Sequence, residues 1–400
     1  MAEAKQILTF SRNIKASPSE VYRSFTNAMA LREWLCNIAE IDPQPGGRFY
    51  VWWPQGYYAS GEFTELEPDE TVVFTWMGKG EPAPTQIRVS IAPSDEGTAV
   101  TLTHSGLGAG EAWQDAMRQF NRGWDFGLDN LKQTLETGID QRILRRPFLG
   151  VADGALIDED ALEHVPESGG LRLDNLVEGA SLYNAGLRVG DILVSLGDVP
   201  VSGFQSLGTF LATRLAGDEV EAVFYRNNER MTADVQLSEQ PAPEIPATPT
   251  ELSTTAREVY QQMFAEMTTV METLDDESAS QQPKPGEWSP NQVLAHILLS
   301  ERDTHNWITS ILQGKELNVF TSNHTGRIQA VLEVYPTKAR LLNAIQDSFH
   351  ETYSILANIP DDFVRHKKTY NRMSSNLLLS AQFHMGNHIA QIQKAAALTT

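Results

Sequence analysis

SPNQVLAHILLSERDTHNWITSILQG, residues 289–314, is the stretch that decides the fold of the C-terminal part of this chain. Ser289 is a favoured helix N-cap and Pro290 suits the first helical position, so the sequence predicts that a helix begins here. Apolar residues then recur at three- and four-residue spacing, which gives the predicted helix an apolar face. His296 lies inside the apolar run VLAHILL, where a buried imidazole needs a hydrogen bond or a metal ion.

Three further segments have the same helical spacing of apolar residues. They are STTAREVYQQMFAEMTTVMETL (253–274), TKARLLNAIQDSFHETYSILANI (337–359) and SSNLLLSAQFHMGNHIAQIQKAAAL (374–398). Short polar loops containing Pro and Gly separate most of these helices. The sequence therefore predicts an all-α four-helix bundle over residues 252–400.

His384 and His388 lie in the last of these segments, four residues apart, so both imidazoles leave the same face of the helix. Together with His296 they provide three nitrogen ligands and leave room for others, as divalent-metal sites in bundles require. The alternative is that each is an ordinary histidine, satisfied by hydrogen bonds in a core or interface. Met385 stands where an H-E-x-x-H metalloprotease has its glutamate, so zincin-type proteolysis is not expected.

The segments GEWSPNQVLAHILLSE and HMGNHIAQI resemble the DinB-like family, over about residues 252–395. The resemblance implies that His296, His384 and His388 hold zinc, nickel or another divalent ion. Because the family includes thiol-dependent S-transferases, it also implies a low-molecular-weight thiol, although no motif for one is found and no catalytic residue is identified. Two functions stay open: a ligand- and peptide-binding protein with a metal site and a stress-related or regulatory role, and a metal-dependent transferase acting on a small electrophile.

Glu301 and His305 follow His296 on the same predicted helix but fall on other faces of it. We expect Glu301 in a solvated or helix-flanking position rather than as a base or an additional ligand. His305 is not expected to bind the metal.

A proline-rich linker is predicted over residues 239–251, because its prolines favour extended backbone and exclude a helix interior. Before it, the segment AGLRVGDIL and a strand-turn-strand pattern resemble a PDZ domain of the bacterial protease-associated type, mainly β, over residues 146–238. The resemblance implies that Phe148, Leu149, Gly150 and Val151 offer backbone amides to the carboxylate of a peptide C-terminus. An acidic insertion follows this loop, and a module that only packs against its neighbours is the alternative.

Residues 1–138 combine helical and strand patterns. Ser17, Pro18 and Glu20 form a capping box that starts a helix. Runs such as TVVFTWMG and GTAVTLTHSG alternate apolar and polar residues as strands do, and a long helical pattern ends the segment. This order predicts an α+β fold in which a curved antiparallel sheet grips a C-terminal helix.

The stretches ASPSEVYRSFTN, GGRFYV, GEFTELEPDETVVFTW and LTHSGLG resemble the Aha-type heat-shock ATPase activator homologues of the START-like (SRPBCC) superfamily. The resemblance covers nearly all of residues 6–137 and implies a helix-grip fold with a cavity for a hydrophobic small molecule. Trp52, Trp76, Trp113 and Trp124 are the candidates to line it, and the alternative is that they are core residues. His104, with no partner at ligand spacing, is expected in a turn.

The bulk composition excludes several classes of function. A net charge of −21 argues against nucleic acid, whose phosphates are bound by Lys and Arg. The single cysteine, Cys36, rules out an intramolecular disulfide or a cysteine-rich zinc site, and its apolar neighbours favour a buried, inert thiol. No apolar run is long enough to span a membrane and no signal peptide is recognised, so a cytoplasmic location is expected.

Overall fold

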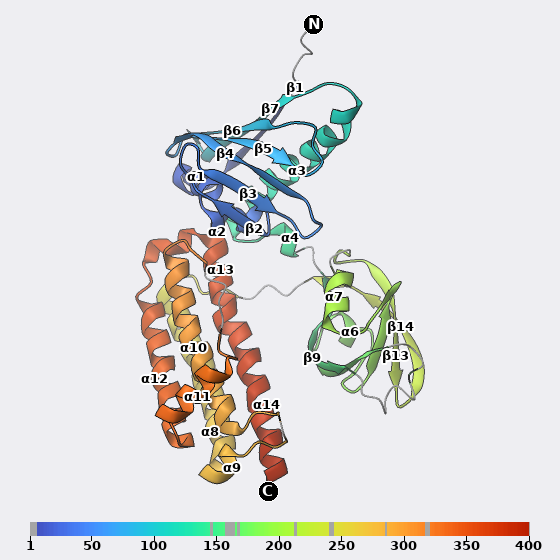
Figure 1. The fold of residues 1–400 in the computed structure, drawn as a ribbon, viewed down its shortest axis with the longest axis vertical. Coiled ribbons are helices and arrows are strands. Elements are labelled where there is room, and N and C mark those ends of the chain that lie inside the picture. Colours follow the sequence, from blue (N-terminus) through green and yellow to red (C-terminus); the bar gives the residue numbers. More distant parts are fainter. Residues whose placement is uncertain are drawn as a thin grey trace. The chain divides into compact units, whose positions relative to one another are not determined.

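The computed structural model describes residues 6–144, 147–156, 165, 169–211, 214–239, 244–284, 286–316 and 321–399. The chain divides into two compact units, one made of Met1–Gly138 with Pro243–Thr400 and the other of Ile139–Ala242 (Figure 1). The first unit holds an N-terminal sheet domain and a C-terminal helical bundle, and the second holds a smaller sheet domain.

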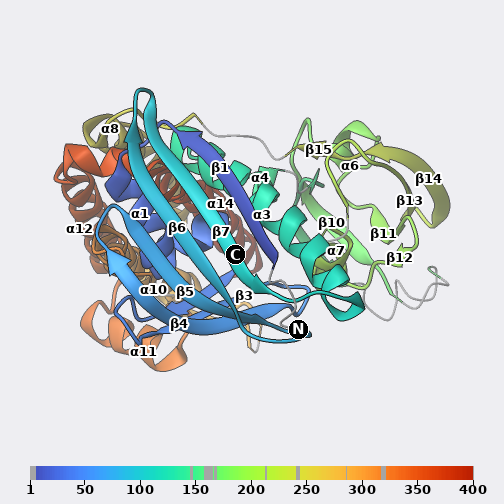
Figure 2. The ribbon, with the colours of Figure 1, turned by 90° about the horizontal axis from the view of Figure 1, so that it is seen from above.

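The N-terminal domain is built on a seven-stranded antiparallel sheet in the order β1-β7-β6-β5-β4-β3-β2 (Figure 2). Helices α1 (Pro18–Thr26) and α2 (Ala28–Trp34) follow β1, and α3 (Glu111–Thr137) follows β7. Buried residues alternate along the strands and form one core with α3, so the predicted helix-grip architecture is confirmed. The strands are β1 (Gln6–Ile14), β2 (Ile38–Ile41), β3 (Arg48–Trp52), β4 (Tyr58–Glu67), β5 (Thr71–Gly78), β6 (Thr85–Ser94) and β7 (Gly97–Leu107).

Local sequence signals set the helix ends of this domain. Ser17 caps α1, and the predicted capping box with Glu20 is present in both directions. Helix α3 ends at Gly138, whose φ of 74° is the left-handed conformation that favours glycine. Cys36 is buried in the core, as its apolar neighbours predicted.

Four long helices form the C-terminal bundle: α8 (Pro249–Glu272), α10 (Pro290–Leu312), α12 (Lys338–Ala357) and α14 (Ala381–Thr399) (Figure 1). Each contacts two others, in the cycle α8-α12-α10-α14, so the four enclose one core. The shorter elements are α9 (Asp276–Ser280), α11 (Thr325–Val334), the 3₁₀-helix η1 (Asp361–Arg365), α13 (Lys367–Ser375) and the π-helix η2 (Asn376–Ser380).

Two helix boundaries differ from the predicted ones. Helix α8 begins at Pro249, inside the range predicted as linker, because Thr248 caps it and proline is well tolerated at the first helical position. The last predicted helix is interrupted by the π-helix Asn376–Ser380, which joins α13 to α14. A π turn changes the helical register, and an apolar spacing pattern does not reveal it.

The second unit contains a sheet in the order β14-β13-β11-β10-β9, with β12 paired to β11. Asn227 and Asn228, both at positive φ, turn β13 into β14, as tight hairpin turns require. The elements are α4 (Gln141–Leu144), β8 (Pro147–Phe148), β9 (Val151–Leu156), β10 (Leu171–Leu176), α6 (Ser181–Asn184), β11 (Ile192–Leu196), β12 (Val199–Pro200), α7 (Phe204–Leu211), β13 (Glu219–Arg226), β14 (Glu229–Gln236) and β15 (Ser238–Glu239), the last paired with β8.

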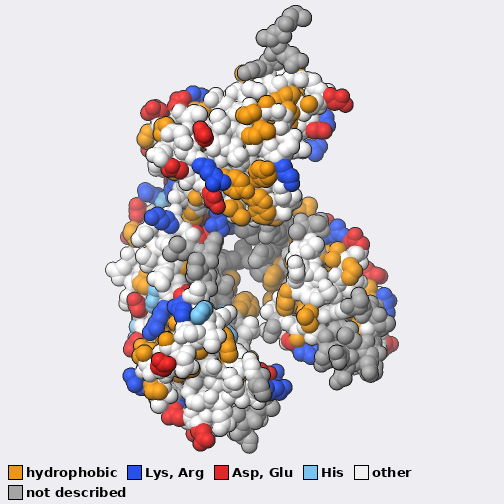
Figure 3. Space-filling view, in the orientation of Figure 1, with side chains coloured by type: hydrophobic (Ala, Val, Ile, Leu, Met, Phe, Trp, Pro, Cys, Tyr) orange, Lys and Arg blue, Asp and Glu red, His pale blue; other side chains and the backbone are white. Residues whose placement is uncertain are grey.

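The surface carries both signs of charge. On the face shown in Figure 3, Lys and Arg side chains are interspersed with Asp and Glu. None of the helices in the described ranges is both long enough and apolar enough to cross a membrane.

Candidate metal centre

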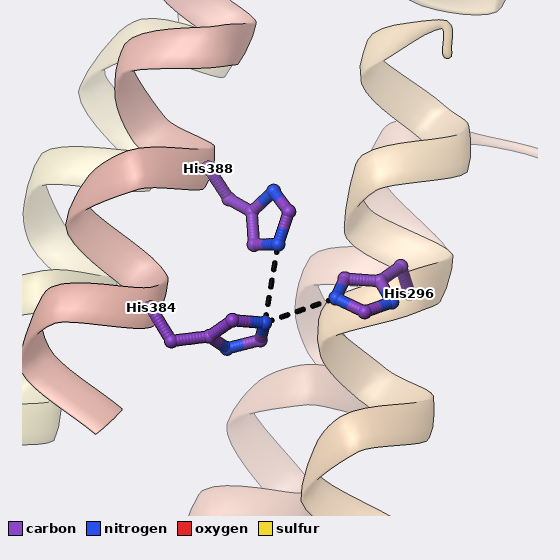
Figure 4. Close-up of side chains that lie close together, drawn as sticks. All are labelled: His296, His384 and His388. Carbon is purple, nitrogen blue, oxygen red and sulfur yellow. Dashed lines mark hydrogen bonds between the residues drawn. The ribbon is translucent and has the colours of Figure 1, made fainter. Parts of the chain in front are cut away.

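Three histidines from two helices of the bundle meet at one point. His296 projects from α10 and His384 and His388 project from α14, and the three rings form a triangle in which His384 contacts both of the others (Figure 4). The capping box of Ser289 and Gln292 fixes the start of α10 two turns before His296. On α14, the residues next to the histidines, Met385 and Ile389, face the core, so the histidines lie at its edge.

The nitrogen positions are those of a ligand set. His384 Nε2 lies 3.0 Å from His296 Nε2 and 3.1 Å from His388 Nε2. One proton on His384 cannot serve two acceptors at once, so protons alone do not satisfy all three ring nitrogens. In a tetrahedral zinc site with Zn–N bonds of about 2.0–2.1 Å, ligand nitrogens lie about 3.3 Å apart. The ligand nitrogens of the three rings all lie within 4.8 Å of one another, so they are close enough for the rings to adjust around one divalent ion.

All three imidazoles favour the neutral form that binds metals. Burial lowers the pKa of His296 to about 4, with a further contribution from His388. Burial also lowers the pKa of His384 to about 4, again helped by His388 and then by His296. For His388 burial lowers the pKa while the hydrogen bond to Gln391 opposes it. Neutral rings keep a free lone pair for a metal, which therefore meets little competition from protons near pH 7.

Neighbouring groups orient these rings. His388 Nδ1 lies 2.9 Å from Gln391 Oε1, and a ring N–H donated there leaves Nε2 as the free lone pair. The Trp288 ring lies 5.1 Å from the His296 ring and packs against it. Gln391 and Trp288 were not singled out from the sequence, although Gln391 follows His388 by three residues, the spacing of helix neighbours.

A pocket of about 610 Å³ opens beside the histidines. Its polar and charged lining comes from α14, from His296 of α10 and from the segments before α10 and α11. Space beside a three-nitrogen ligand set is what an open metal site needs, since the remaining coordination positions must be reachable by water or a ligand. The lining residues are Pro283, Gly286, Glu287, Trp288, His296, Asn323, His384, His388, Gln391, Lys394 and Ala395.

The prediction that Glu301 is solvated is wrong, because its side chain points into the bundle interior. The residue is only 7% exposed, and the Thr352 hydroxyl on α12 donates a hydrogen bond to its carboxylate. Burial raises the pKa of Glu301 to about 7, while the Thr352 hydrogen bond opposes the rise. His305 Nε2 lies 2.8 Å from the same hydroxyl, so His305 belongs to this cluster and not to the three-histidine cluster.

The prediction that His104 lies in a turn is also wrong, since the residue lies within β7 and is fully buried. The indole N–H of Trp124 donates to His104 Nδ1 at 3.2 Å, so Nε2 carries the proton and donates to the Thr85 hydroxyl at 2.7 Å. Thr85 in turn donates to the Trp76 carbonyl at 3.0 Å. Burial lowers the pKa of His104 to about 3, which keeps the ring neutral.

Three of the four tryptophans proposed for a hydrophobic pocket, Trp76, Trp113 and Trp124, are buried in the packed core of the sheet domain. Trp52 alternates with the buried residues Phe49 and Val51 and so lies on the other face of β3. This packing agrees with the alternative that they are structural, and a ligand pocket formed by the four stays a prediction.

In the second unit, the four predicted peptide-binding residues join β8 to β9: Phe148 ends β8, Leu149 and Gly150 follow, and Val151 begins β9. Strand β9 lies at one edge of the described sheet. The domain itself binds the carbonyl oxygens of this loop, through the Ser181 hydroxyl to Phe148 (2.6 Å), the Leu182 amide to Leu149 (3.2 Å) and the Val177 amide to Gly150 (2.8 Å).

Comparison with known proteins supports the assignment of the two domains of the first unit. Residues 15–136 match the family model described as Activator of Hsp90 ATPase homolog 1-like protein, and residues 259–392 match the DinB superfamily. The human Activator of 90 kDa heat shock protein ATPase homolog 1 is 26% identical over 132 residues, which are 33% of this chain and 37% of that protein. The serine protease Do-like HtrA of Lactococcus lactis subsp. lactis is 30% identical over 104 residues, 24% of this chain and 25% of that protein.

Solved structures match about a third of the chain. The Aha1 dimer from Colwellia psychrerythraea is 26% identical, with a TM-score of 0.29, and the match covers 33% of this chain and 96% of that one. Protein MLL2253 from Mesorhizobium loti is 23% identical with a TM-score of 0.30, covering 32% and 96%. The chain spans well under two thirds of the curated relatives. It carries an Aha1-like domain over residues 15–136 and a DinB-like domain, with its three-histidine cluster, over residues 259–392.

Proposed function

We propose that the bundle binds one divalent metal ion through His296, His384 and His388 and keeps coordination positions open toward the adjacent pocket. The observation that supports this most directly is the approach of three Nε2 atoms, with separations of 3.0 and 3.1 Å about His384, that protons alone do not satisfy. Three neutral imidazoles suit zinc, nickel and similar ions. Such an ion supplies Lewis-acid chemistry.

The site supports either a binding role or a metal-dependent transfer reaction on a small electrophile. The DinB-like match and the open pocket favour a reactive metal over a structural one, because a structural zinc site is closed by four protein ligands. A low-molecular-weight thiol is the co-substrate that the resemblance to S-transferases suggests. Turnover with a panel of thiols and alkylating electrophiles separates the two roles. Only a transferase accelerates thioether formation above the uncatalysed rate, as the thiolate sulfur bonds to the electrophilic carbon and the leaving group departs with its bonding electrons.

Metal content tests the site itself. We expect about one equivalent of zinc or nickel in purified wild-type protein by elemental mass spectrometry, and loss of this metal in the His384→Ala/His388→Ala variant. His350, an exposed histidine on α12, provides the matched control, and His350→Ala should retain the metal. Equal metal content in all three proteins would refute the assignment.

We also propose that the second unit captures the carboxylate of a peptide C-terminus at residues 148–151. The carbonyl oxygens of Phe148, Leu149 and Gly150 each accept a hydrogen bond from a group within the second unit. In a trans peptide bond, the N–H of the next residue points in the direction opposite to the carbonyl oxygen. The amides of Leu149, Gly150 and Val151 therefore point away from those donors. Val151 pairs with Leu176 in β10, and the bond from Val177 to Gly150 makes this a non-hydrogen-bonded pair, so the amide of Val151 faces outward.

Paired peptides test this second proposal. Because the recognition is by backbone amides, a random peptide library with free C-termini should bind more tightly than the same library with amidated C-termini. Fluorescence anisotropy of both libraries on the full chain measures the difference. The same affinity for free and amidated termini would exclude carboxylate capture.

A further inference from the structure

The pocket beside the histidines has an unbalanced charge once an ion is present. Among the described residues that line it, the charged side chains are Glu287 and Lys394, whose formal charges cancel. The proposed ligand group consists of histidines alone, and an imidazole that binds a metal through a ring lone pair carries no charge. A divalent ion held by neutral ligands keeps its full positive charge, whereas carboxylate ligands would reduce it. The loaded pocket therefore favours an anion.

Lys394 is placed to bind the end of such an anion that does not contact the metal. It follows His388 by six residues on α14, which is about 9 Å along the helix axis. Six residues turn an α-helix by about 600°, so Lys394 leaves the helix about 120° away from His388, and both side chains line the same pocket. Glu287 belongs to the loop before α10, and its side chain is exposed.

The pocket lining also has a short apolar part. Trp288 packs its ring against His296, and Pro283 and Ala395 also line the pocket. One lining therefore combines the proposed metal position, apolar surface and the ammonium group of Lys394. This combination is matched by a ligand with a donor atom, a short carbon chain and a carboxylate.

We propose that the pocket binds a small acid with a metal-binding donor atom at one end and a carboxylate at the other, and that Lys394 selects the carboxylate. This inference rests on the metal site proposed above. It makes Lys394 a specificity-determining residue that acts on ligand binding and leaves metal retention unchanged.

The experiment uses the full chain loaded with Co²⁺ and three thiols that differ only in their tails: 3-mercaptopropionate, 3-mercaptopropanol and 3-mercaptopropylamine. Thiolate coordination to Co²⁺ produces a near-ultraviolet charge-transfer band, which gives each affinity without any turnover. We expect Lys394→Met to weaken the acid about fivefold, the effect of removing one partly solvated charge, and to leave the alcohol unchanged. Glu287→Gln, the matched control, should weaken only the amine.

The outcomes separate this inference from the metal site. If Co²⁺ is retained and the thiols bind, but Lys394→Met shifts all three affinities equally or not at all, Lys394 does not select the carboxylate and the inference is overturned. If no thiol produces the band, or Co²⁺ is not retained, the open metal site itself is refuted. For each thiol, the ratio of the wild-type affinity to the variant affinity cancels differences in thiol acidity. An unchanged affinity for 3-mercaptopropanol shows that the variant's metal site and pocket are intact.

Discussion

Glu301 carries a buried carboxyl group inside the bundle, and its amide variant Glu301→Gln isolates the effect of its charge. The pKa rises from 4.5 to about 7 because burial disfavours the carboxylate. Each pH unit of such a rise corresponds to about 1.4 kcal/mol, so the ionised form destabilises the folded bundle by about 3 kcal/mol. Glutamine keeps the shape and still accepts the hydrogen bond from Thr352, but it has no proton to lose.

The sign of the effect follows from the direction of the rise. A carboxyl whose pKa is higher in the folded state contributes its stability fully below pH 4.5, and that contribution is lost as the pH rises through about 7. Between pH 4.5 and 8, wild type should therefore lose about 3 kcal/mol of unfolding free energy relative to Glu301→Gln. Because other groups titrate equally in both proteins, the difference between them isolates this one carboxyl.

Urea unfolding at several pH values measures this difference, followed by the helical circular dichroism signal that the bundle dominates. Glu351→Gln is the matched control, since Glu351 also faces His305 but has a side chain that is 66% exposed. It should change the pH dependence by no more than a few tenths of a kcal/mol. Parallel pH profiles for wild type and Glu301→Gln would refute the reasoning.

Two further predictions concern other hydrogen-bonded polar side chains. Gln391→Ala removes the acceptor that orients His388 and should lower metal affinity about 10- to 100-fold in a chelator competition. Gln391→Glu keeps an acceptor and should bind the metal with normal affinity. Equal metal affinities in wild type and both variants would contradict this role of Gln391. His104→Phe leaves Trp124 and Thr85 without their partner and should cost about 2 kcal/mol at pH 7. Because burial lowers the pKa of His104 to about 3, the wild-type advantage is present above pH 6.5 and is lost as the pH falls toward 3. Tryptophan fluorescence should show the gap closing by pH 4, and a constant gap would contradict the assignment.

The grouping of the three histidines was predictable because helical spacing places His384 and His388 on one face. The cap at Ser289 also fixes the helix that carries His296. The cluster around Glu301 was not predictable in the same way. Its partner Thr352 is 51 residues away on another helix, and the contact depends on how α10 and α12 pack. Spacing along one helix reports which residues share a face, but not what that face meets.

The strand residue His104 shows a second limit. The run LTHSG ends in small, turn-favouring residues, yet β7 continues to Leu107 through them because it pairs on both sides, with β1 and β6. Tertiary pairing overrides local turn propensity in this way. The start of α8 was predicted too late because a local signal was assigned to the wrong element. Pro249 was interpreted as a linker proline, although proline also suits a first helical turn.

The π-helix Asn376–Ser380 makes the proposed metal centre tolerant of a change in chain length. A π turn holds one residue more than an α turn, so deleting Leu379, which is 38% exposed, can leave a continuous α-helix behind. Five residues of a π-helix turn the chain by about 410°, close to the roughly 400° of four residues of an α-helix, so His384 and His388 would still face His296. Such a protein should retain its metal, as should Leu379→Ala. Homologues that share the three histidines but lack this extra residue should then bind metal too, which metal analysis of a few natural variants can test.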